Sequence, residues 1–523
     1  MDINAESKMI IKNNHRVLLS ENLETYGSAN VGAGCNLPRV PSTDQLVRLD
    51  DKPKEACGVF GIMAFGEDVA RLTFFGLYAL QHRGQESCGI ATFSDHNVFL
   101  HKDVGLVSQV FNEEILTKLQ GDIAVGHTRY STTGSNNICN AQPILVTYKD
   151  LKIVLAHNGN LVNATELRNH LISNGYKFES TTDSEVMAKL IIFELNNTND
   201  LKTAIKQAFI KCKGAYSVVL GTKDSLVAVR DPDGVRPLCI GITSKGQHVL
   251  ASETCALDII GASYKREVSP GEIVFINKEQ KLESSLFVSE IKPHHCIFEL
   301  IYFSRPDSTF KGLSIYHFRK ELGRQLARES PVDADYVISV PDSGTPAAIG
   351  FAEELKLPFS EGLIKNRYVG RTFIQPSQML RELGIRLKLN PLKDIIAGKR
   401  IVVVDDSIVR GNTSRKIVKL LRDSGAKAVH MRISSPPVQW PCFYGIDIDS
   451  RDQLIAAKKS IEEITNYIEA DTLKYISHEG MVKSTGLSRE TFCTACFSGK
   501  YPIEIPKELD GAKLRYERMK HEA

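Results

Sequence analysis

The stretch IVVVDDSIVRGNTS, residues 401–414, decides the fold of the second half of this chain. Its apolar start predicts a buried strand that ends at Asp405 and Asp406. A loop, Ser407–Asn412, follows, and we expect a helix to open near Thr413. The N–H groups of such a loop, with nearby hydroxyls and the helix N-terminus, can hold a phosphate.

The two carboxylates indicate what accompanies that phosphate. A phosphate would repel them, but a sugar diol would donate hydrogen bonds to them, and the same loop adds Arg410. A surface turn is the alternative, because acids commonly follow strands. The complete strand–loop–helix arrangement favours a phosphoribosyl site.

A second strand–turn–helix unit, SVPDSGTPAA at residues 339–348, places Asp342 and Ser343 where they can approach a diphosphate. Apolar strands followed by loops and helices predict a parallel doubly wound sheet, which binds ligands at the carboxyl ends of its strands. The basic stretch 365–391 is expected to be a mobile flap that closes over diphosphate and excludes water. Lys365, Arg367 and Arg371 are its candidate anion contacts.

Composition sets the broad class. The chain has 523 residues, of which 42% are hydrophobic and 24% charged, and its net charge is +3. This length predicts two domains of about 200 residues each. The small net charge does not indicate nucleic-acid binding, and no stretch approaches the roughly 18 apolar residues of a membrane span.

The first 56 residues are polar and are expected to form a flexible leader. They mix acids with bases and contain no apolar block, so they resemble neither a secretory signal nor a transit peptide. The 11 cysteines are too few for a disulfide scaffold in a chain of this length. We therefore expect a reducing compartment, the cytoplasm.

Short β-rich runs punctuated by glycine begin at Cys57, with amphipathic stretches such as 183–195 between them. This pattern predicts an α+β sandwich. Cys57, in KEACGVFGI at residues 54–62, has no histidine nearby in sequence. It is either a buried core cysteine or a nucleophile activated by its own α-amine. An α-amine titrates near pH 8, close to the value of about 8.5 for a thiol.

Several motifs resemble those of class II glutamine amidotransferases, which have the N-terminal-nucleophile fold. The motifs are ACGVFGI, LQHRGQES, GHTRYSTTG, AHNGNL, TTDSE and DPDGVRPL. The resemblance implies cleavage before Cys57, an oxyanion hole formed by Asn158 and Gly159, and glutamine binding by Arg129 and Asp183. Taken singly, Asp183 could be a helix N-cap and Asn158-Gly159 a turn.

Residues 401–414 resemble the signature of type I phosphoribosyltransferases. Asn412 stands where a threonine is commoner in that signature. The implied contacts to phosphoribosyl diphosphate are Lys365, Arg367, Asp405, Asp406, Ser407, Arg410, Gly411 and Thr413. Mg²⁺ would bridge diphosphate and ribose, with Ser343, Asp405 and Asp406 as ligands directly or through water.

The chain from Cys57 to about Pro506 resembles the glutamine phosphoribosyldiphosphate amidotransferase family, in its iron–sulfur branch. The resemblance implies that Cys296, Cys442, Cys493 and Cys496 ligate a 4Fe–4S cluster. On ligand chemistry alone, zinc remains open, and the CxxC of Cys493 and Cys496 also suits redox chemistry. The remaining cysteines are expected to be structural.

The expected domains are a leader (1–56), an amidotransferase domain (57–290), a phosphoribosyltransferase domain (291–475) and a C-terminal segment (476–523). The expected reaction makes 5-phosphoribosylamine from glutamine and phosphoribosyl diphosphate and opens purine synthesis. The resemblance also implies a homotetramer and feedback inhibition by purine nucleotides. The alternatives are another class II amidotransferase, which would not need residues 405–414, and a non-catalytic regulator with a phosphoribosyl fold.

Overall fold

The computed structural model describes residues 57–94, 97–130, 137–366, 388–448 and 450–506. The leader at 1–56, most of the expected flap with Arg367 and Arg371, and the charged tail from 507 lie outside these ranges. None of the helices described is long and apolar enough to cross a membrane.

The region from Cys57 to about residue 290 contains two antiparallel sheets. The first has the order β11 (Ser263–Glu267), β9 (Cys239–Ile242), β10 (His248–Ala251), β1 (Gly58–Met63), β4 (Ile123–Arg129), β2 (Ser87–Ser94) and β3 (Asn97–Val104). The second has the order β13 (Leu282–Leu286), β12 (Glu272–Asn277), β8 (Ser225–Arg230), β7 (Gly214–Gly221), β6 (Leu151–Leu161) and β5 (Ile144–Tyr148).

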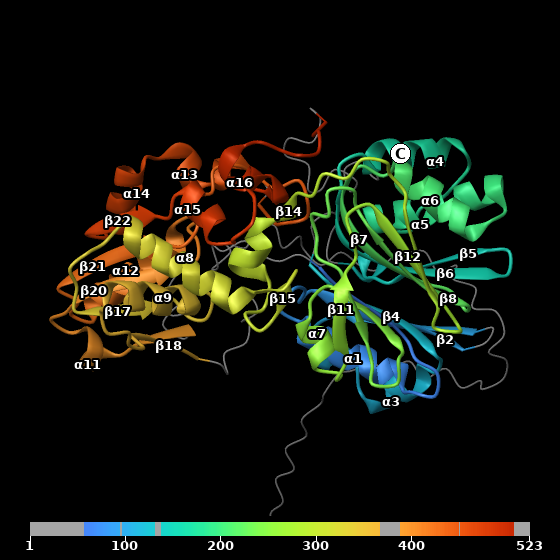
Figure 1. Ribbon diagram of the computed structural model, residues 1–523, viewed down its shortest axis with the longest axis horizontal. Helices are drawn as coiled ribbons and strands as arrows, with labels where there is room; N and C mark the ends of the chain where they lie inside the picture. Colours follow the sequence, from blue (N-terminus) through green and yellow to red (C-terminus); the bar gives the residue numbers. More distant parts are fainter. Residues whose placement is uncertain (1–56, 95–96, 131–136, 367–387, 449, 507–523) are drawn as a thin grey trace, which may run out of the picture. The chain divides into compact units, whose positions relative to one another are not determined.

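Helices cover the outer faces of both sheets. They are α1 (Val69–Ala79), α2 (Val107–Val110), α3 (Glu113–Lys118) and α7 (Cys255–Asp258) beside the first sheet, and α4 (Ala164–Ser173), α5 (Asp183–Thr198) and α6 (Leu201–Lys211) beside the second. In Figure 1 these layers follow one another from α4–α6 through the two sheets to α1 and α7.

The interior strands of this sandwich, such as β4 and β7, are buried along their whole length, which explains their nearly continuous apolar sequences. In β6, Val154 and Ala156 pack between the sheets, whereas Ile153 and Leu155 pack against the outer helices. The alternation follows from the two-residue period of a strand. The predicted α+β sandwich is confirmed.

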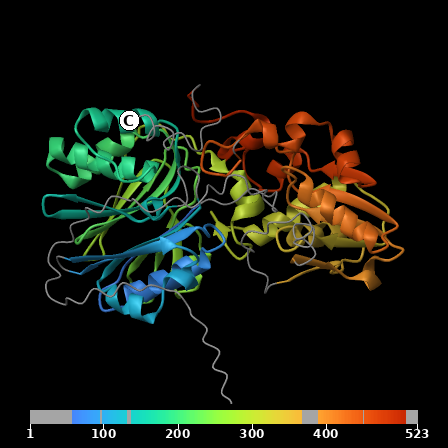
Figure 2. The same cartoon turned by 180° about the vertical axis from the view of Figure 1, so that it is seen from behind.

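The second region is built on a parallel sheet with the order β17 (Tyr336–Ser339), β20 (Arg400–Asp405), β21 (Ala428–Ile433) and β22 (Thr472–Tyr475). Its main helices are α8 (Ile315–Glu329), α9 (Thr345–Leu355), α12 (Asn412–Asp423) and α14 (Ile461–Ile468). Val402 and Val404 pack in the core beside α8 and α9, while Ile401 and Val403 face α12 and α14. Helices α8 and α9 lie in front of this sheet in Figure 1, and the orange α12 lies in front of it in Figure 2.

The strand order reverses at β17. On one side, Val337 of β17 bridges Phe359, which follows α9; on the other side β17 pairs with β20. A doubly wound sheet opens a crevice at such a switch point, at the carboxyl ends of its strands. The Asp342-Ser343 turn and the Asp405–Gly411 loop both begin at this crevice. The predicted parallel sheet is confirmed.

The remaining elements are short. They are β14 (His295–Cys296), a π-helix (Glu299–Phe303), β15 (Thr309–Phe310), β16 (Leu313–Ser314), β18 (Leu363–Lys365), β19 (Leu389–Pro391), α11 (Lys393–Ile396), α13 (Ile455–Lys458), α15 (His478–Lys483), β23 (Phe492–Cys493) and α16 (Ala495–Ser498), with 3-10 turns at Ile138–Asn140, Arg451–Gln453 and Arg489–Thr491. The amphipathic stretch predicted at 183–195 lies in α5, which begins at Asp183. Helix α12 begins one residue before the expected Thr413.

Candidate functional site

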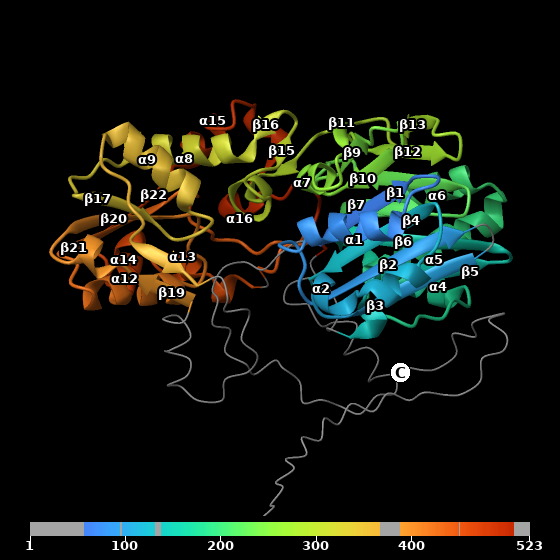
Figure 3. The ribbon, with the colours of Figure 1, turned by 90° about the horizontal axis from the view of Figure 1, so that it is seen from below.

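Cys57 immediately precedes β1, which lies in the interior of the first sheet between β10 and β4 (Figure 3). The thiol is 5% exposed and donates a 3.5 Å hydrogen bond to the carbonyl oxygen of Tyr130. Burial raises the pKa of this thiol, the charge of Arg129 lowers it, and the charge of Asp183 raises it. Two residues expected to bind glutamine are therefore electrostatic neighbours of the expected nucleophile.

Arg129 and Asp183 are both buried. The Oδ2 atom of Asp183 accepts a 2.9 Å hydrogen bond from the N–H of Leu161, and its Oδ1 lies 3.7 Å from Nδ1 of His157. Burial alone would raise the pKa of Asp183, but the charge and hydrogen bond of His157 outweigh it and hold the pKa below its usual value. The N-cap of α5 is Thr182, so Asp183 is not a capping residue.

Asn158 and Gly159 lie inside β6, not in a turn. The Asn158 side chain is fully buried, and neither amide atom has a hydrogen-bond partner among the described residues. An unmade hydrogen bond at a buried polar group costs about 1–3 kcal/mol, so this amide suits a ligand that would complete it. Gly159 has φ +142°, and a Cβ there would lie 2.0 Å from the oxygen of Ala215, so only glycine fits.

A buried ionic network adjoins Cys57 that the sequence did not predict. The Nε atom of Arg83 donates to the Cys57 carbonyl oxygen at 3.0 Å, and the same guanidinium pairs with Glu253 and Glu299. Nη1 of Arg236 donates to Oε1 of Glu299 at 2.9 Å, and Nη2 of Arg83 donates to the same oxygen. Arg83 lies in LQHRGQES, but nothing local in that motif indicates its distant acidic partners.

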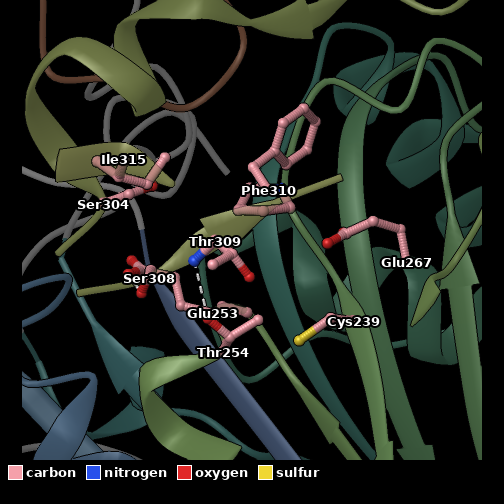
Figure 4. A pocket seen from close by; sticks show the side chains of 11 residues that line it. Cys239, Glu253, Thr254, Glu267, Ser304, Ser308, Thr309, Phe310 and Ile315 are labelled. Atoms are coloured by element: carbon pink, nitrogen blue, oxygen red, sulfur yellow. Dashed lines mark hydrogen bonds between the residues drawn. The ribbon is translucent and has the colours of Figure 1, made fainter. Parts of the chain in front are cut away.

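A small pocket lies on the far side of Glu253, between β9 and the segment that follows the π-helix (Figure 4). Across it the N–H of Thr309 donates to the hydroxyl of Thr254 at 2.9 Å, and Glu253 accepts from Ser308. None of the predicted site residues lines this pocket. Glu253 therefore links the segment that follows the π-helix to Arg83, and it is not part of a substrate site.

The two loops of the phosphoribosyl site meet at the switch point of the parallel sheet. Asp405 and Asp406 are each 1% exposed, which excludes a surface turn. The hydroxyl of Ser343 donates to Oδ1 of Asp406 at 2.5 Å, and that of Ser407 donates to Oδ2 at 2.6 Å. The N–H of Asp406 donates to Oδ1 of Asp405 at 2.9 Å.

The expected anion contacts surround this pair of loops. Gly411 caps α12, and Asn412 and Thr413 open the helix; Asn412 accepts a 2.7 Å hydrogen bond from the Tyr467 hydroxyl. Arg410 donates to the amide oxygen of Gln453 at 3.0 Å. Lys365, the last residue of β18, donates to Asp342 at 2.6 Å. The structure thus places Lys365 beside the Asp342-Ser343 turn.

The four candidate cluster cysteines converge from three distant parts of the chain. Cys296 and Cys493 are register partners in the parallel pair of β14 and β23, and Cys496 follows in α16. Burial raises the pKa of Cys493 and Cys496, and the charges of Cys296 and Cys442 raise both further. All four are free thiols. Within the described ranges no group of three or more histidine, cysteine, aspartate or glutamate side chains is arranged to hold a metal ion.

Two domain families match this chain. A glutamine amidotransferase domain matches residues 127–258, and a phosphoribosyl transferase domain matches residues 318–434. The first match covers Arg129, Asn158 and Asp183, and the second covers Ser343 and the Asp405-Asp406 pair.

Whole-chain relatives extend these matches. The amidophosphoribosyltransferase of Synechococcus elongatus is 58% identical over 92% of this chain and 99% of its own. The glutamine phosphoribosylpyrophosphate (PRPP) amidotransferase from B. subtilis, solved in complex with ADP and GMP, is 47% identical with a TM-score of 0.82, over 87% of this chain and all of its own. A structure described as the allosteric regulatory enzyme of purine biosynthesis is 48% identical with a TM-score of 0.83, over 88% of this chain and 99% of its own.

Proposed function

Because this chain belongs to the amidophosphoribosyltransferase family, it is a glutamine-dependent pentosyltransferase of purine biosynthesis, and we propose which of its residues carry out each step. The reaction converts phosphoribosyl diphosphate, glutamine and water into 5-phosphoribosylamine, diphosphate and glutamate. The amidotransferase fold and the doubly wound phosphoribosyltransferase fold each supply one half of it.

In the amide half, Cys57 is the nucleophile and becomes the first residue when the leader is removed. Its freed α-amine takes the thiol proton, and the sulfur attacks the amide carbon of glutamine. The oxyanion that forms accepts hydrogen bonds from the Asn158 side chain and the Gly159 N–H. Ammonia leaves and a thioester remains, which water hydrolyses to glutamate. Arg129 binds the carboxylate of glutamine and Asp183 its ammonium group.

In the phosphoribosyl half, ammonia attacks the anomeric carbon as diphosphate departs. Asp405 and Asp406 accept hydrogen bonds from the ribose hydroxyls, and the loop from Ser407 to Thr413 binds the 5-phosphate. Lys365 and Arg367 bind the diphosphate. The burial of both aspartates beside Ser343, at the switch point of the sheet, is the observation that supports this assignment most strongly.

The residues present suit Mg²⁺ at this site. Mg²⁺ keeps several waters and needs only one or two carboxylates besides substrate phosphates, so Ser343, Asp405 and Asp406 are a sufficient donor set. When bound, the ion neutralises charge on the departing diphosphate. These residues hold the ribose and the two loops in place.

The cysteine quartet suits a 4Fe–4S cluster. Four free thiols, of which Cys296, Cys493 and Cys496 are buried and Cys442 is partly buried, are the donor set of such a cluster or of structural zinc. The charges of Cys296, Cys493 and Cys442 all raise the pKa of Cys496, so the four thiols are electrostatic neighbours. We therefore assign the chain to the iron–sulfur branch.

We place the domain boundaries at 57–290, 291–475 and 476–523, and we propose a homotetramer regulated by purine nucleotides. The relative solved with ADP and GMP and the one described as allosteric support the regulation. Of the cysteines in the described ranges, nine are free and Cys139 is disulfide-bonded; the preponderance of free thiols supports a reducing compartment, and we propose the cytoplasm.

Diphosphate release, measured with glutamine or with ammonium as the nitrogen source, tests the proposal. Cys57→Ala should abolish the reaction with glutamine and keep the reaction with ammonium, because the phosphoribosyl site is separate. The purified active protein should begin at Cys57. Full glutamine activity in the variant, or in protein that keeps its leader, would contradict the nucleophile assignment. Phosphoribosyl-diphosphate-independent glutaminase activity alone would indicate a different class II amidotransferase.

A further inference from the structure

Helix α14 packs beside α12, which begins at the loop proposed to bind the 5-phosphate (Figure 3). Ile464 and Ile468 of α14 are fully buried in the core to which α12 also contributes. These two residues anchor the last turn of α14, which ends at Ile468. Tyr467 belongs to this turn and is partly buried. An anchored helix therefore holds the Tyr467 side chain beside the phosphate loop.

The Tyr467 ring lies against Gly411, the residue that caps α12. Gly411 is buried and has φ +84°, in the left-handed region that favours glycine. A Cβ built on it would lie 2.8 Å from Cδ1 of Ile455 and 3.3 Å from Cε1 of Tyr467. Both distances are shorter than an ordinary contact between carbon atoms. Ile455 and the Tyr467 ring therefore form the wall against which the loop turns into α12.

The Tyr467 hydroxyl makes a second contact, to the first residue of α12. It donates a 2.7 Å hydrogen bond to Oδ1 of Asn412, where a threonine is commoner in the type I signature. The acceptor oxygen of an asparagine lies one bond farther from the backbone than a threonine hydroxyl. The guanidinium carbon of Arg415 lies over the Tyr467 ring, 5.3 Å from its centroid. Two residues of α12 thus fix the position of this side chain.

Further bonds join the same parts of the chain. The N–H of Ile455 donates to the carbonyl oxygen of Val409 at 2.9 Å, and Nε of Arg410 donates to the amide oxygen of Gln453 at 3.0 Å. With the ring and hydroxyl contacts of Tyr467, these bonds join four consecutive loop residues to the segment that runs from the last 3-10 residue before α13 to the end of α14. The direction of the loop backbone therefore depends on this segment.

We propose that Tyr467 is a positioning residue for the phosphoribosyl half-reaction. Its ring supports Gly411 and its hydroxyl orients Asn412, so that the N–H groups at the start of α12 are directed at the 5-phosphate. Tyr467 does not contact the substrate in this assignment. The inference rests on the proposed function, because it assumes that the loop from Ser407 to Thr413 binds the 5-phosphate.

Two variants of Tyr467 test the two contacts separately. Tyr467→Phe removes only the hydroxyl and should raise KM for phosphoribosyl diphosphate about three- to fivefold, with glutamine and with ammonium alike. Its kcat should change by less than about twofold, because a phosphate contact remote from the reacting carbon stabilises the bound substrate and the transition state equally. Tyr467→Leu also removes the ring and should raise this KM at least about tenfold. Neither variant should change KM for glutamine.

Product-like inhibitors distinguish positioning of the loop from general loosening of the site. Ribose 5-phosphate carries the 5-phosphate, so its inhibition constant should rise in Tyr467→Phe by the same factor as KM. Inorganic diphosphate is assigned to the Asp342-Ser343 turn and to Lys365, which donates to Asp342. Its inhibition constant should stay unchanged. Equal rises in both constants, or no rise in either, would overturn the positioning role.

A double-mutant cycle with Asn412→Ala tests the hydroxyl contact. The double variant should be no worse than the weaker-binding single variant, because both substitutions remove one bond. Effects on KM that multiply would contradict this contact.

Glu469→Gln is the matched control. Glu469 directly follows α14 and accepts a 2.8 Å hydrogen bond from Arg415, and both side chains are about half exposed, where an ion pair contributes little. Its KM for phosphoribosyl diphosphate should equal that of the unmodified enzyme. A rise as large as that of Tyr467→Phe would show that any loosening of α14 has the same effect, and the specific role of Tyr467 would be wrong. If ribose 5-phosphate does not compete with phosphoribosyl diphosphate in the unmodified enzyme, the proposed function of the loop itself fails.

Discussion

Ser343 and Asp406 are joined by a 2.5 Å hydrogen bond, although they belong to different strand–turn–helix units. The bond links the carboxyl ends of β17 and β20, the two strands between which the sheet reverses its order. Each strand–turn–helix unit forms one wall of the crevice, so the proposed phosphoribosyl site requires both units. Neither loop alone could hold a ribose and a diphosphate together.

The first prediction concerns Asp405→Asn and Asp406→Asn. Each should lower transfer by at least about 100-fold with glutamine and with ammonium alike, because the proposed role of the carboxylates is to bind ribose, for which the nitrogen source is irrelevant. Steady-state diphosphate release with each nitrogen source checks this. Ser407→Ala is a milder comparison that removes one hydroxyl donor to Asp406. Normal ammonium-dependent rates in both aspartate variants would reject the diol assignment.

The local sequence predicted the strands, loops and helices that carry the candidate site residues. It did not predict the long-range contacts that hold these elements together. Residues 401–414 predicted a strand, an acid pair and a helix because each signal lies within a few residues of the next. The Arg83–Glu299 pair and the Asp447–Tyr130 contact join residues hundreds of positions apart or between domains. A charged residue in a sequence gives no sign of being buried with a distant partner, so no local pattern could have identified them.

The second prediction concerns Asn158, whose side-chain amide has no hydrogen-bond partner among the described residues. Asn158→Leu should lower kcat with glutamine about 100- to 1,000-fold, because it removes the proposed oxyanion donor. It should not lower Tm, since it replaces a buried polar group that has no partner within the described ranges by an apolar one of similar size. Thermal unfolding and glutaminase kinetics on the same samples check both parts. A Tm loss as large as that of an ordinary core substitution would show that the amide is satisfied in the folded protein.

The third prediction concerns pH and the buried ionic network. Burial alone would raise the pKa of Glu299, but Arg83 and Arg236 outweigh it and hold the pKa below its usual value. The unfolded chain, with a glutamate pKa near 4.3, therefore binds this proton first as pH falls. The stabilisation by Glu299 is complete above about pH 5 and is lost as pH falls through the lower folded-state pKa.

Glu299→Gln should therefore lower Tm at pH 7, because it removes the carboxylate that pairs with the buried Arg236 and one of the two that pair with the buried Arg83. The difference in Tm from the unmodified protein should shrink below about pH 4. Scans from pH 7 to pH 3 measure it, with Glu462→Gln, at an exposed position of α14, as the control. A Tm difference that stays constant across this range would contradict a role for the ionised form.

The last prediction concerns the cysteine quartet. Cys296 and Cys493 pair across β14 and β23, Cys442 lies between β21 and α13, and Cys496 lies in α16. Four thiolates would complete the coordination of the proposed cluster and leave no position for substrate, so its proposed role is to hold these segments together. Protein purified without oxygen should be brown, and Cys493→Ser should lower iron content and Tm together. Cys212→Ser, at a buried free cysteine after α6, should change neither the colour nor the iron content.

Because Cys442 begins the segment whose Gly445 contacts Gly159, loss of iron should reduce glutamine-dependent turnover more than ammonium-dependent turnover. One zinc and no iron per chain after anaerobic purification would exclude the cluster and leave a structural zinc site.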